Sequence, residues 1–347
     1  MKARRLLKND ALLRRARRCG RDAVFQQPAG ARFSAAAAIV AILLVVLVGV
    51  TGCAGATQNS SAGEQRGSAA NVSSATPGVL ATTTYLADIV RNVAGDRVLV
   101  VSLLPMGSDP HAFEPRPRDA RTIANSRLVV SDTVGLSPVV DALVKATVQP
   151  GTRVLEAAAG LVGRRTLQGD EQGGEVDPHF WLDPVNVITY VANIRDALIA
   201  LDPRDAATFR SNADVYSGRL RDLDAWIRTQ VSTIPTGRRL LVTNHEAFGY
   251  FAERYGFTIV GTVFRTLGAE GTPSARQLAQ LVAAVREAKA PAIFLETGSN
   301  ADLADEVARE TGAKVVTDLY THSLGKNASD YIEMMRWDVR LIVEALR

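Results

Sequence analysis

The sequence predicts an α/β protein with two pseudo-symmetric lobes, each a mainly parallel sheet flanked by helices, joined by one long rigid connecting helix. From residue 79 onward, short β-branched runs alternate with helical patterns, which is typical of parallel sheets. Residues 204–234 are rich in polar side chains, carry apolar residues at helical spacing and contain no Pro, so they predict the long helix. The expected lobes are residues 78–203 and 235–347, with a cleft between them.

The elements of the first half follow one another at short intervals. Gly95 ends the first helical pattern, as a Gly commonly ends a helix. We expect strands at 79–84, 97–104 and 127–132, and helices at 85–95, through 120–125 and at 137–147.

The second half repeats this order. We expect strands at 239–244, 257–264, 292–296 and 314–320, and helices at 246–256, 274–290 and 302–312. The opening units of the two halves can be overlaid, because Thr84 lies eleven residues before Gly95 and His245 lies eleven before Gly256. This correspondence indicates an internal duplication.

The N-terminal segment has the pattern of a secretion signal. An Arg-rich stretch precedes an uncharged apolar run of 16 residues, Ala35 to Val50, which Thr51, Gly52 and Cys53 follow. Small residues before a single Cys are typical of the lipobox of bacterial lipoproteins. We therefore expect a signal peptide at 1–52, lipid attachment at Cys53 and a flexible tether over 53–77, rich in Ser, Ala and Gly. The lipid would anchor the folded part to the outer face of the cell membrane.

The charge of the chain depends on this segment. Residues 1–52 contain ten of the 40 basic residues and two of the 36 acidic residues, which leaves 30 against 34 and a net charge of about −4. A nucleic-acid partner is therefore not expected.

Cys19 and Cys53 are the only cysteines. A chain processed at Cys53 has no second thiol for a disulfide, and neither an all-cysteine zinc site nor a thiol nucleophile is available.

The chain has four histidines, and each follows a predicted strand or lies in a loop: His111, His179, His245 and His322. In open α/β sheets, ligands bind outside the carboxyl ends of the strands. We therefore expect the four imidazoles to meet in the cleft, two from each half. Imidazole suits zinc and other late first-row metals, and four protein ligands leave no position for a substrate water. This favours metal binding over enzymatic activity.

Several carboxylates near the histidines compete as ligands or as acceptors for imidazole N–H groups. Asp183 precedes a Pro and a helical pattern, so it is expected to cap the next helix. Glu296 is the best candidate acceptor, because a ligating imidazole usually donates its other N–H group. The remaining candidates are Glu114, Asp177, Glu246 and Asp318.

The segments around these residues resemble the cluster A-I family, the zinc and manganese solute-binding lipoproteins and adhesins of bacterial ABC importers. The resemblance runs from about residue 78 to the C-terminus. It is carried by DPHAFEP with the following RPRDARTIANSRLVV, DPHFWLDP, TNHEAFGYFAERYG, TPSARQLAQLVAAVREAKAPAIFLE and THSLGKNASDYIEMMRWDVRLIVEAL.

Carried over by position, the resemblance makes His111, His179 and His245 three metal ligands. His at the third position favours zinc, since many manganese receptors of the family have Glu there. The family usually has Asp at the fourth position, where this chain has His322. The fourth ligand is therefore expected to be His322, with Asp318, or Glu296 beside three histidines, as alternatives. The acidic stretch RRTLQGDEQGGEVD lacks the His-rich loop of many zinc receptors, which weakens the assignment to zinc.

The resemblance implies an extracytoplasmic, monomeric lipoprotein that captures Zn²⁺ and delivers it to a membrane permease powered by a cytoplasmic ATPase. The chain has no GxxxxGK[ST] motif and no multi-span region, so these partners are separate proteins. The alternatives are a Mn²⁺ or iron receptor of the same family and a surface adhesin. A secreted zinc hydrolase is a weaker alternative, because the sequence contains no HExxH motif.

Overall fold

The computed structural model describes residues 78–133, 135–170, 173–264 and 273–347. The predicted signal peptide, Cys53 and the tether lie outside the described residues. Within the described residues, no helix combines the length and the apolar character needed to cross a membrane.

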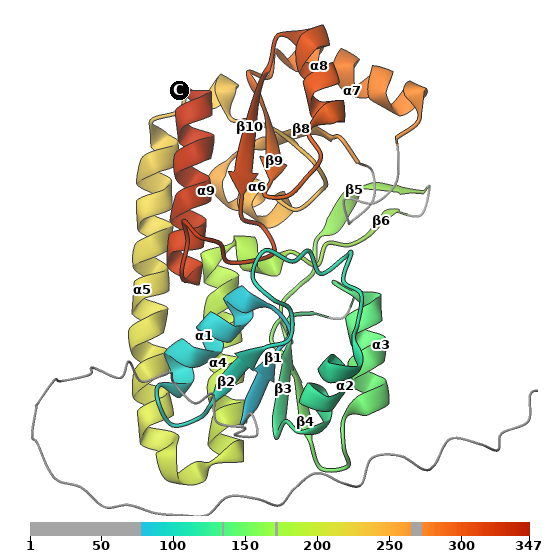
Figure 1. Ribbon diagram of the computed structural model, residues 1–347. Coiled ribbons are helices and arrows are strands. Elements are labelled where there is room, and N and C mark those ends of the chain that lie inside the picture. The colour runs from blue at the N-terminus through green and yellow to red at the C-terminus, as the bar shows by residue number, and fades with distance from the viewer. Residues whose placement is uncertain (1–77, 134, 171–172, 265–272) are drawn as a thin grey trace, which may run out of the picture. The chain divides into compact units, whose positions relative to one another are not determined.

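The first lobe is built on a parallel four-stranded sheet with the order β2-β1-β3-β4 (Figure 1). Helices α2 and α3 cover one face, and α1 and α4 lie toward the other. The elements are β1 (Val79–Ala81), α1 (Thr84–Ala94), β2 (Val100–Ser102), α2 (Pro117–Ala124), β3 (Leu128–Ser131), α3 (Pro138–Thr147), β4 (Arg153–Glu156) and α4 (Pro184–Leu201).

The second lobe has a parallel sheet with the order β10-β9-β7-β8. Helices α7 and α8 pack on one face, and α6 and α9 on the other. The elements are β7 (Leu240–Thr243), α6 (Gly249–Tyr255), β8 (Thr258–Thr262), α7 (Ala275–Ala288), β9 (Ala292–Glu296), α8 (Asp302–Thr311), β10 (Lys314–Leu319) and α9 (Tyr331–Leu346). Read from its other edge, this sheet has the order of the first, with β7 in the place of β1, as the predicted duplication requires.

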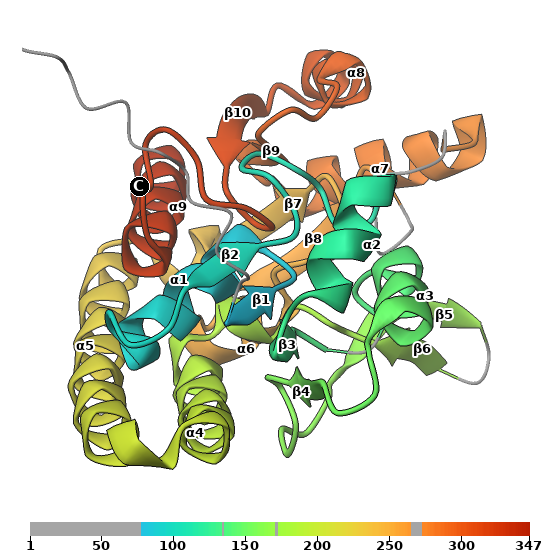
Figure 2. The same ribbon diagram turned by 60° about the horizontal axis from the view of Figure 1, so that its bottom comes forward.

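The two lobes share one long helix, α5 (Ala206–Ser232), which the short η2 (Pro203–Asp205) precedes. Its 27 residues span about 40 Å. It packs against α1 and α4 of the first lobe and α9 of the second, and Figures 1 and 2 both show α4 beside it. Its apolar side is buried, including Phe209, Leu220, Leu223 and Ile227, so the helix is part of a core that both lobes share.

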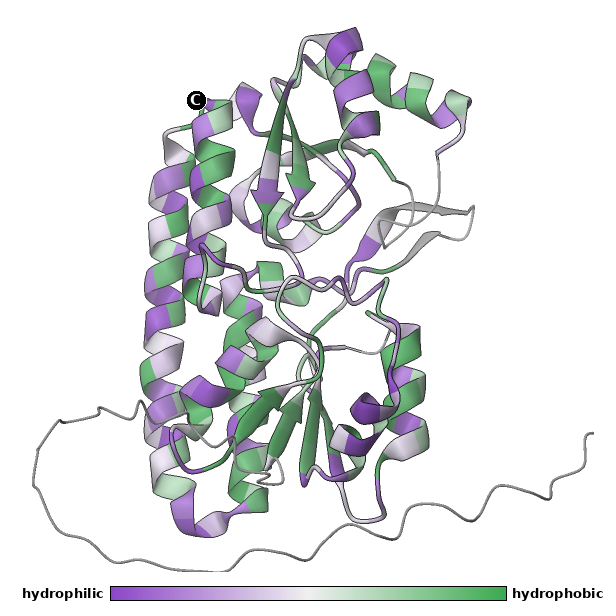
Figure 3. Cartoon of the chain, in the orientation of Figure 1, coloured by the Kyte–Doolittle hydropathy of each residue, from purple (hydrophilic) through white to green (hydrophobic). Residues whose placement is uncertain are grey.

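The hydropathy of the elements agrees with this layering. Figure 3 shows mostly hydrophobic strands in the first sheet, whereas hydrophilic and hydrophobic residues alternate along α5. A strand buried between helices reads as a continuous apolar run, and a half-buried helix reads as a periodic one.

Four segments differ from the prediction. The acidic stretch forms an antiparallel hairpin of β5 (Arg165–Asp170) and β6 (Gly173–Val176), and β4 was not expected at all. The short helical turns η1 (Phe180–Leu182) and η3 (Thr236–Arg238) were also not predicted.

Candidate metal centre

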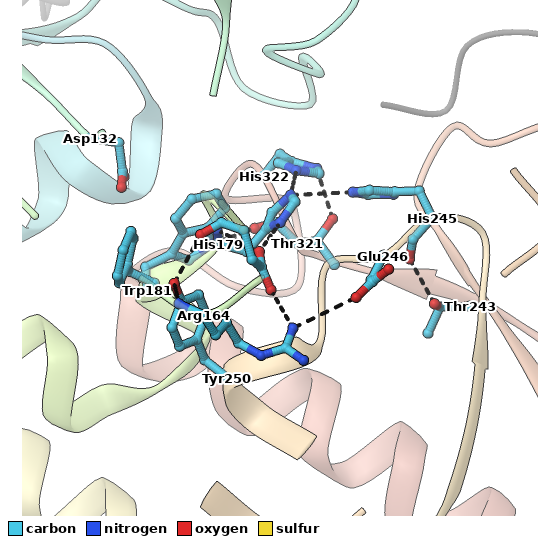
Figure 4. Close-up of polar contacts among 12 residues, drawn as sticks. Asp132, Arg164, His179, Trp181, Thr243, His245, Glu246, Tyr250, Thr321 and His322 are labelled. Atoms are coloured by element: carbon cyan, nitrogen blue, oxygen red, sulfur yellow. Dashed lines mark hydrogen bonds and ion pairs between the residues drawn. The ribbon is translucent and has the colours of Figure 1, made fainter. Parts of the chain in front are cut away.

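The four histidines come together between the lobes. His111 follows β2, His179 lies just before η1, His245 follows β7 and His322 follows β10. One nitrogen of each ring belongs to a group whose members all lie within 4.8 Å of one another. His179, His245 and His322 are almost completely buried, and Figure 4 shows these three rings pointing toward one another.

The same local turn presents the two histidines of the first lobe. In both DPH sequences the Asp side chain accepts a hydrogen bond from the backbone N–H of the His two residues later. The distance is 2.8 Å from Asp109 to His111 and 3.0 Å from Asp177 to His179. Such turns are characteristic of Asp before Pro, and they direct both rings into the cleft.

The spacing of the imidazole nitrogens suits a tetrahedral cation. The Nε2 atom of His322 lies 3.3 Å from that of His111 and 3.1 Å from that of His179, and the Nε2 atoms of His179 and His245 are 3.3 Å apart. Four nitrogens at zinc-bonding distance from one ion are separated by about 3.3 Å. Three of the separations therefore match a four-coordinate metal, and all four nitrogens lie within 4.8 Å of one another.

Buried carboxylates orient three of the rings. The Nδ1 atom of His179 lies 2.8 Å from Asp177, and the Nδ1 atoms of His245 and His322 lie 2.8 and 3.1 Å from the two oxygens of Glu296. Thr321 Oγ1 is also 2.9 Å from Nδ1 of His322. An imidazole that donates from Nδ1 presents a lone pair at Nε2, so His179 and His322 can present lone pairs to the centre. The Nδ1 atom of His245 lies at ion-pair distance from Glu296 but forms no hydrogen bond with it. Glu296, the candidate acceptor in the sequence, lies beside the rings of both His245 and His322.

The electrostatics of the centre favour neutral rings at two positions. Burial lowers the pKa of His179 to about 4, although Asp177 opposes the shift. Burial and the neighbouring imidazoles also lower the pKa of His111. For Glu296, burial alone would raise the pKa, but His245 and His322 hold it well below its usual range. Burial opposes protonation of His322 as well, yet Glu296 raises the pKa of that ring.

Arg164 contacts Asp177, the carboxylate beside His179, and was not among the residues predicted from the sequence. Its guanidinium forms a 2.8 Å ion pair with Asp177 and lies 3.7 Å from Glu246 of the second lobe (Figure 4). Burial would raise the pKa of Asp177, but the contacts with His179 and Arg164 lower it, which keeps the acceptor of His179 charged.

Trp181 is a second supporting residue that no local sequence pattern predicts. Its ring stacks on Tyr85 with centroids 4.7 Å apart and lies 5.2 and 5.8 Å from the rings of His179 and His322. Its Nε1 donates a 2.7 Å hydrogen bond to the carbonyl oxygen of Thr321. The aromatic pair after the second DPH was the only signal in the sequence.

The other candidate carboxylates lie outside the group of four nitrogens. Asp183 caps α4, accepting a 2.8 Å bond from the N–H of Val185, as predicted. Asp318 is exposed, and its side chain accepts from Thr317 Oγ1. Glu246 faces Arg164, and Glu114 lies on an exposed surface cavity beyond the His111 loop.

A cavity of about 270 Å³ opens beside the centre. His322, Glu296 and Tyr320 of the second lobe line it together with Gly107 and Asp109 of the first. Its lining is rich in hydroxyl, carboxylate and backbone groups, so a hydrated ion could occupy it.

A two-lobed α/β fold with a buried, carboxylate-supported imidazole centre defines a binding protein for a metal ion. The profile of the family described as zinc-uptake complex component A, periplasmic, matches residues 79–345. The chain belongs to this family, which comprises the substrate-binding lipoproteins of cluster A-I metal ABC transporters.

Individual relatives agree with this assignment. The manganese-binding lipoprotein MntA of Halalkalibacterium halodurans is 34% identical over 271 residues, which cover 77% of this chain and 88% of that protein. The Mn-bound periplasmic metal-binding protein from Candidatus Liberibacter asiaticus has a TM-score of 0.70 at 28% identity, over 78% of this chain and 99% of that chain. The periplasmic zinc-binding protein TroA from Treponema pallidum has a TM-score of 0.71 at 25% identity, with the same coverage.

Proposed function

We propose that this protein is a zinc receptor that captures Zn²⁺ outside the cytoplasmic membrane through His111, His179, His245 and His322. The observation that carries the proposal is the set of Nε2 separations of 3.1 to 3.3 Å. Four imidazole nitrogens match the preference of Zn²⁺, whereas Mn²⁺ prefers oxygen ligands and higher coordination.

The closed ligand set also bears on activity. Four protein ligands leave no open position at which a tetrahedral metal could activate water, and a hydrolytic zinc site keeps such a position. The centre is therefore suited to holding an ion and releasing it, not to hydrolysis.

The delivery step requires partners that are separate chains. We infer that Cys53 carries the lipid, that the chain acts as a monomer at the outer face of the membrane, and that it passes the ion to a permease driven by a cytoplasmic ATPase. Membership of a family of ABC-transporter substrate-binding lipoproteins supports this part of the proposal.

A manganese receptor is the second candidate, because MntA is named for manganese and the Liberibacter protein was solved with Mn bound. Equilibrium competition with a fluorescent chelator separates the two metals. We expect the full chain to bind one Zn²⁺ at least about 100-fold more tightly than Mn²⁺, given the nitrogen-only ligand set. His111→Ala should abolish tight binding. Equal affinities, or tighter binding of Mn²⁺, would overturn the zinc assignment.

A further inference from the structure

The loop that carries His322 belongs to the second lobe by sequence but is hydrogen-bonded to the first. It leaves β10 after Leu319 and reaches α9 at Tyr331. At its start, the carbonyl oxygen of Thr321 accepts the 2.7 Å bond from Trp181 of the first lobe. At its end, the backbone N–H of Tyr331 donates a 3.0 Å bond to Asp88 of α1.

A further hydrogen bond between the loop and the first lobe joins two hydroxyl groups, one of them on Ser323, the residue after His322. Ser323 Oγ lies 3.0 Å from Oγ1 of Thr84, the first residue of α1, although 239 positions separate them. Thr84 Oγ1 also accepts a 2.8 Å bond from the backbone N–H of Leu324. Ser323 Oγ accepts a 2.7 Å bond from the N–H of Gly107, in the loop that leads to His111.

These contacts are compatible with a single arrangement of protons. The Ser323 hydroxyl donates to the carbonyl oxygen of Leu324 at 2.9 Å, so it can accept from Gly107 and from Thr84. Thr84 then donates to Ser323 and accepts from Leu324. Each hydroxyl uses its one proton, and Ser323, which is 8% exposed, has its hydrogen bonds satisfied.

We propose that Thr84 and Ser323 form an interlobe latch that positions His322 and sets the residence time of the bound metal. The inference rests on the proposed function, because it assumes that the four imidazoles hold the ion. Ser323 is bonded both to α1 and to the His111 loop. Separation of the lobes therefore breaks the latch, and it also withdraws His322 from His111 and His179. Among the hydrogen bonds between this loop and the first lobe, this residue pair couples metal release to lobe opening most directly, because Ser323 follows His322 in the chain.

Metal release from the full chain tests the latch. Zn²⁺ is withdrawn by an excess of chelator in a stopped-flow instrument, and tryptophan fluorescence is recorded, since Trp181 adjoins the site. The variants are Thr84→Val, Ser323→Ala and the double variant. Thr122→Val and Ser232→Ala are matched controls, because these hydroxyls are exposed and bond only to their own helix.

We expect each latch variant to release Zn²⁺ at least about 3- to 10-fold faster, the range that the loss of one hydrogen bond gives, with a much smaller change in the association rate. Each variant removes the Thr84–Ser323 bond and at least one further bond of the same hydroxyl group. The double variant should fall short of the product of the two single effects, because the variants remove the same bond. Thr84→Ser, which keeps the hydroxyl, should restore slow release.

A spectroscopic measurement separates positioning from general destabilisation. The Co²⁺-loaded latch variants should show a weakened tetrahedral absorption band, whereas the controls keep the band of the unaltered chain. Release rates equal to those of the controls, or Thr84→Ser as fast as Thr84→Val, would overturn the latch while leaving the metal site intact. Failure of the unaltered chain to bind Zn²⁺ would overturn the proposed function, and the latch with it.

Discussion

The Nε2 atoms of His179 and His322 lie 3.1 Å apart, although 143 positions separate these residues in the chain. Both rings have a carboxylate at Nδ1, Asp177 for one and Glu296 for the other. With the Nδ1 protons directed at these carboxylates, the Nε2 atoms face each other as lone pairs unless one is protonated. Two lone pairs at this distance repel each other, and a cation bound between the two nitrogens removes the repulsion. The pair is therefore suited to metal binding.

Glu296 should matter for affinity although it is not placed among the ligands. Glu296→Gln removes the negative charge beside His245 and His322 and leaves one carbonyl oxygen for the two rings, so one of the rings loses its carboxylate partner. We expect Zn²⁺ affinity to fall about 10- to 100-fold, as is usual when the acceptor of a ligating imidazole is lost. Isothermal titration calorimetry measures the change. Glu287→Gln on the exposed side of α7 is the control, and a variant with unchanged affinity would show that Glu296 does not orient the rings.

The identity of the fourth ligand, His322, should determine the selectivity between Zn²⁺ and Mn²⁺. His322→Asp introduces an oxygen ligand at the position where the family usually has Asp. We expect the preference for Zn²⁺ over Mn²⁺ to fall by about tenfold or more, since Mn²⁺ favours carboxylate ligands. Competition titrations with both metals give the ratio. If the ratio in the variant equals that of the unaltered chain, His322 does not determine selectivity.

Asp132 should make the stability of the metal-free protein depend on pH. Tyr85 and Tyr190 donate hydrogen bonds to its carboxylate, but burial dominates and raises its pKa from 3.8 to about 7. Between these values the folded chain keeps a proton that the unfolded chain has lost. The free energy of unfolding therefore falls as the pH rises through this window, with a slope approaching 1.4 kcal/mol per pH unit at most, about the value for one proton.

Urea denaturation of the metal-free chain from pH 4 to pH 8 measures this slope, and Asp132→Asn, which cannot ionise, is the comparison. As the pH rises, the free energy of unfolding of the unaltered chain should fall relative to that of Asp132→Asn. If the difference in unfolding free energy between the two proteins is the same from pH 4 to pH 8, Asp132 has the same pKa in the folded and the unfolded chain.

Bound metal should stabilise the chain, because ligands from both lobes meet only in the folded state. At a free Zn²⁺ concentration 100 times the dissociation constant, the gain is about 2.7 kcal/mol. Differential scanning fluorimetry should show a rise in melting temperature with Zn²⁺ that a chelator reverses. His245→Ala should lose this rise, and retention of the full rise would place the ion elsewhere.

Local patterns accounted for most of the fold. β9 has the predicted bounds, Ala292 to Glu296, because its apolar run is buried and continuous. β4 was missed because it is a short edge strand with two exposed residues at its start, and it carries no periodic signal. The β5–β6 hairpin is polar and rich in Gly, so nothing in its sequence distinguishes it from a loop.

His179 follows the antiparallel β5–β6 hairpin, but His111, His245 and His322 were predictable, because they follow strands of the parallel sheets, whose ends meet at one edge. The residues that support them were not. Arg164, Trp181 and Ser323 act through contacts across the interlobe boundary, and no local spacing encodes such contacts. Glu296 was the exception, since it ends a buried strand at the same edge.

X-ray absorption spectroscopy of the Zn²⁺-loaded full chain tests the central claim most directly. We expect a first shell of four nitrogen ligands at about 2.0 Å with the outer-shell scattering of four imidazoles, and three in His322→Ala. A first shell with oxygen ligands, or with fewer than four imidazoles in the unaltered chain, would contradict the four-histidine site.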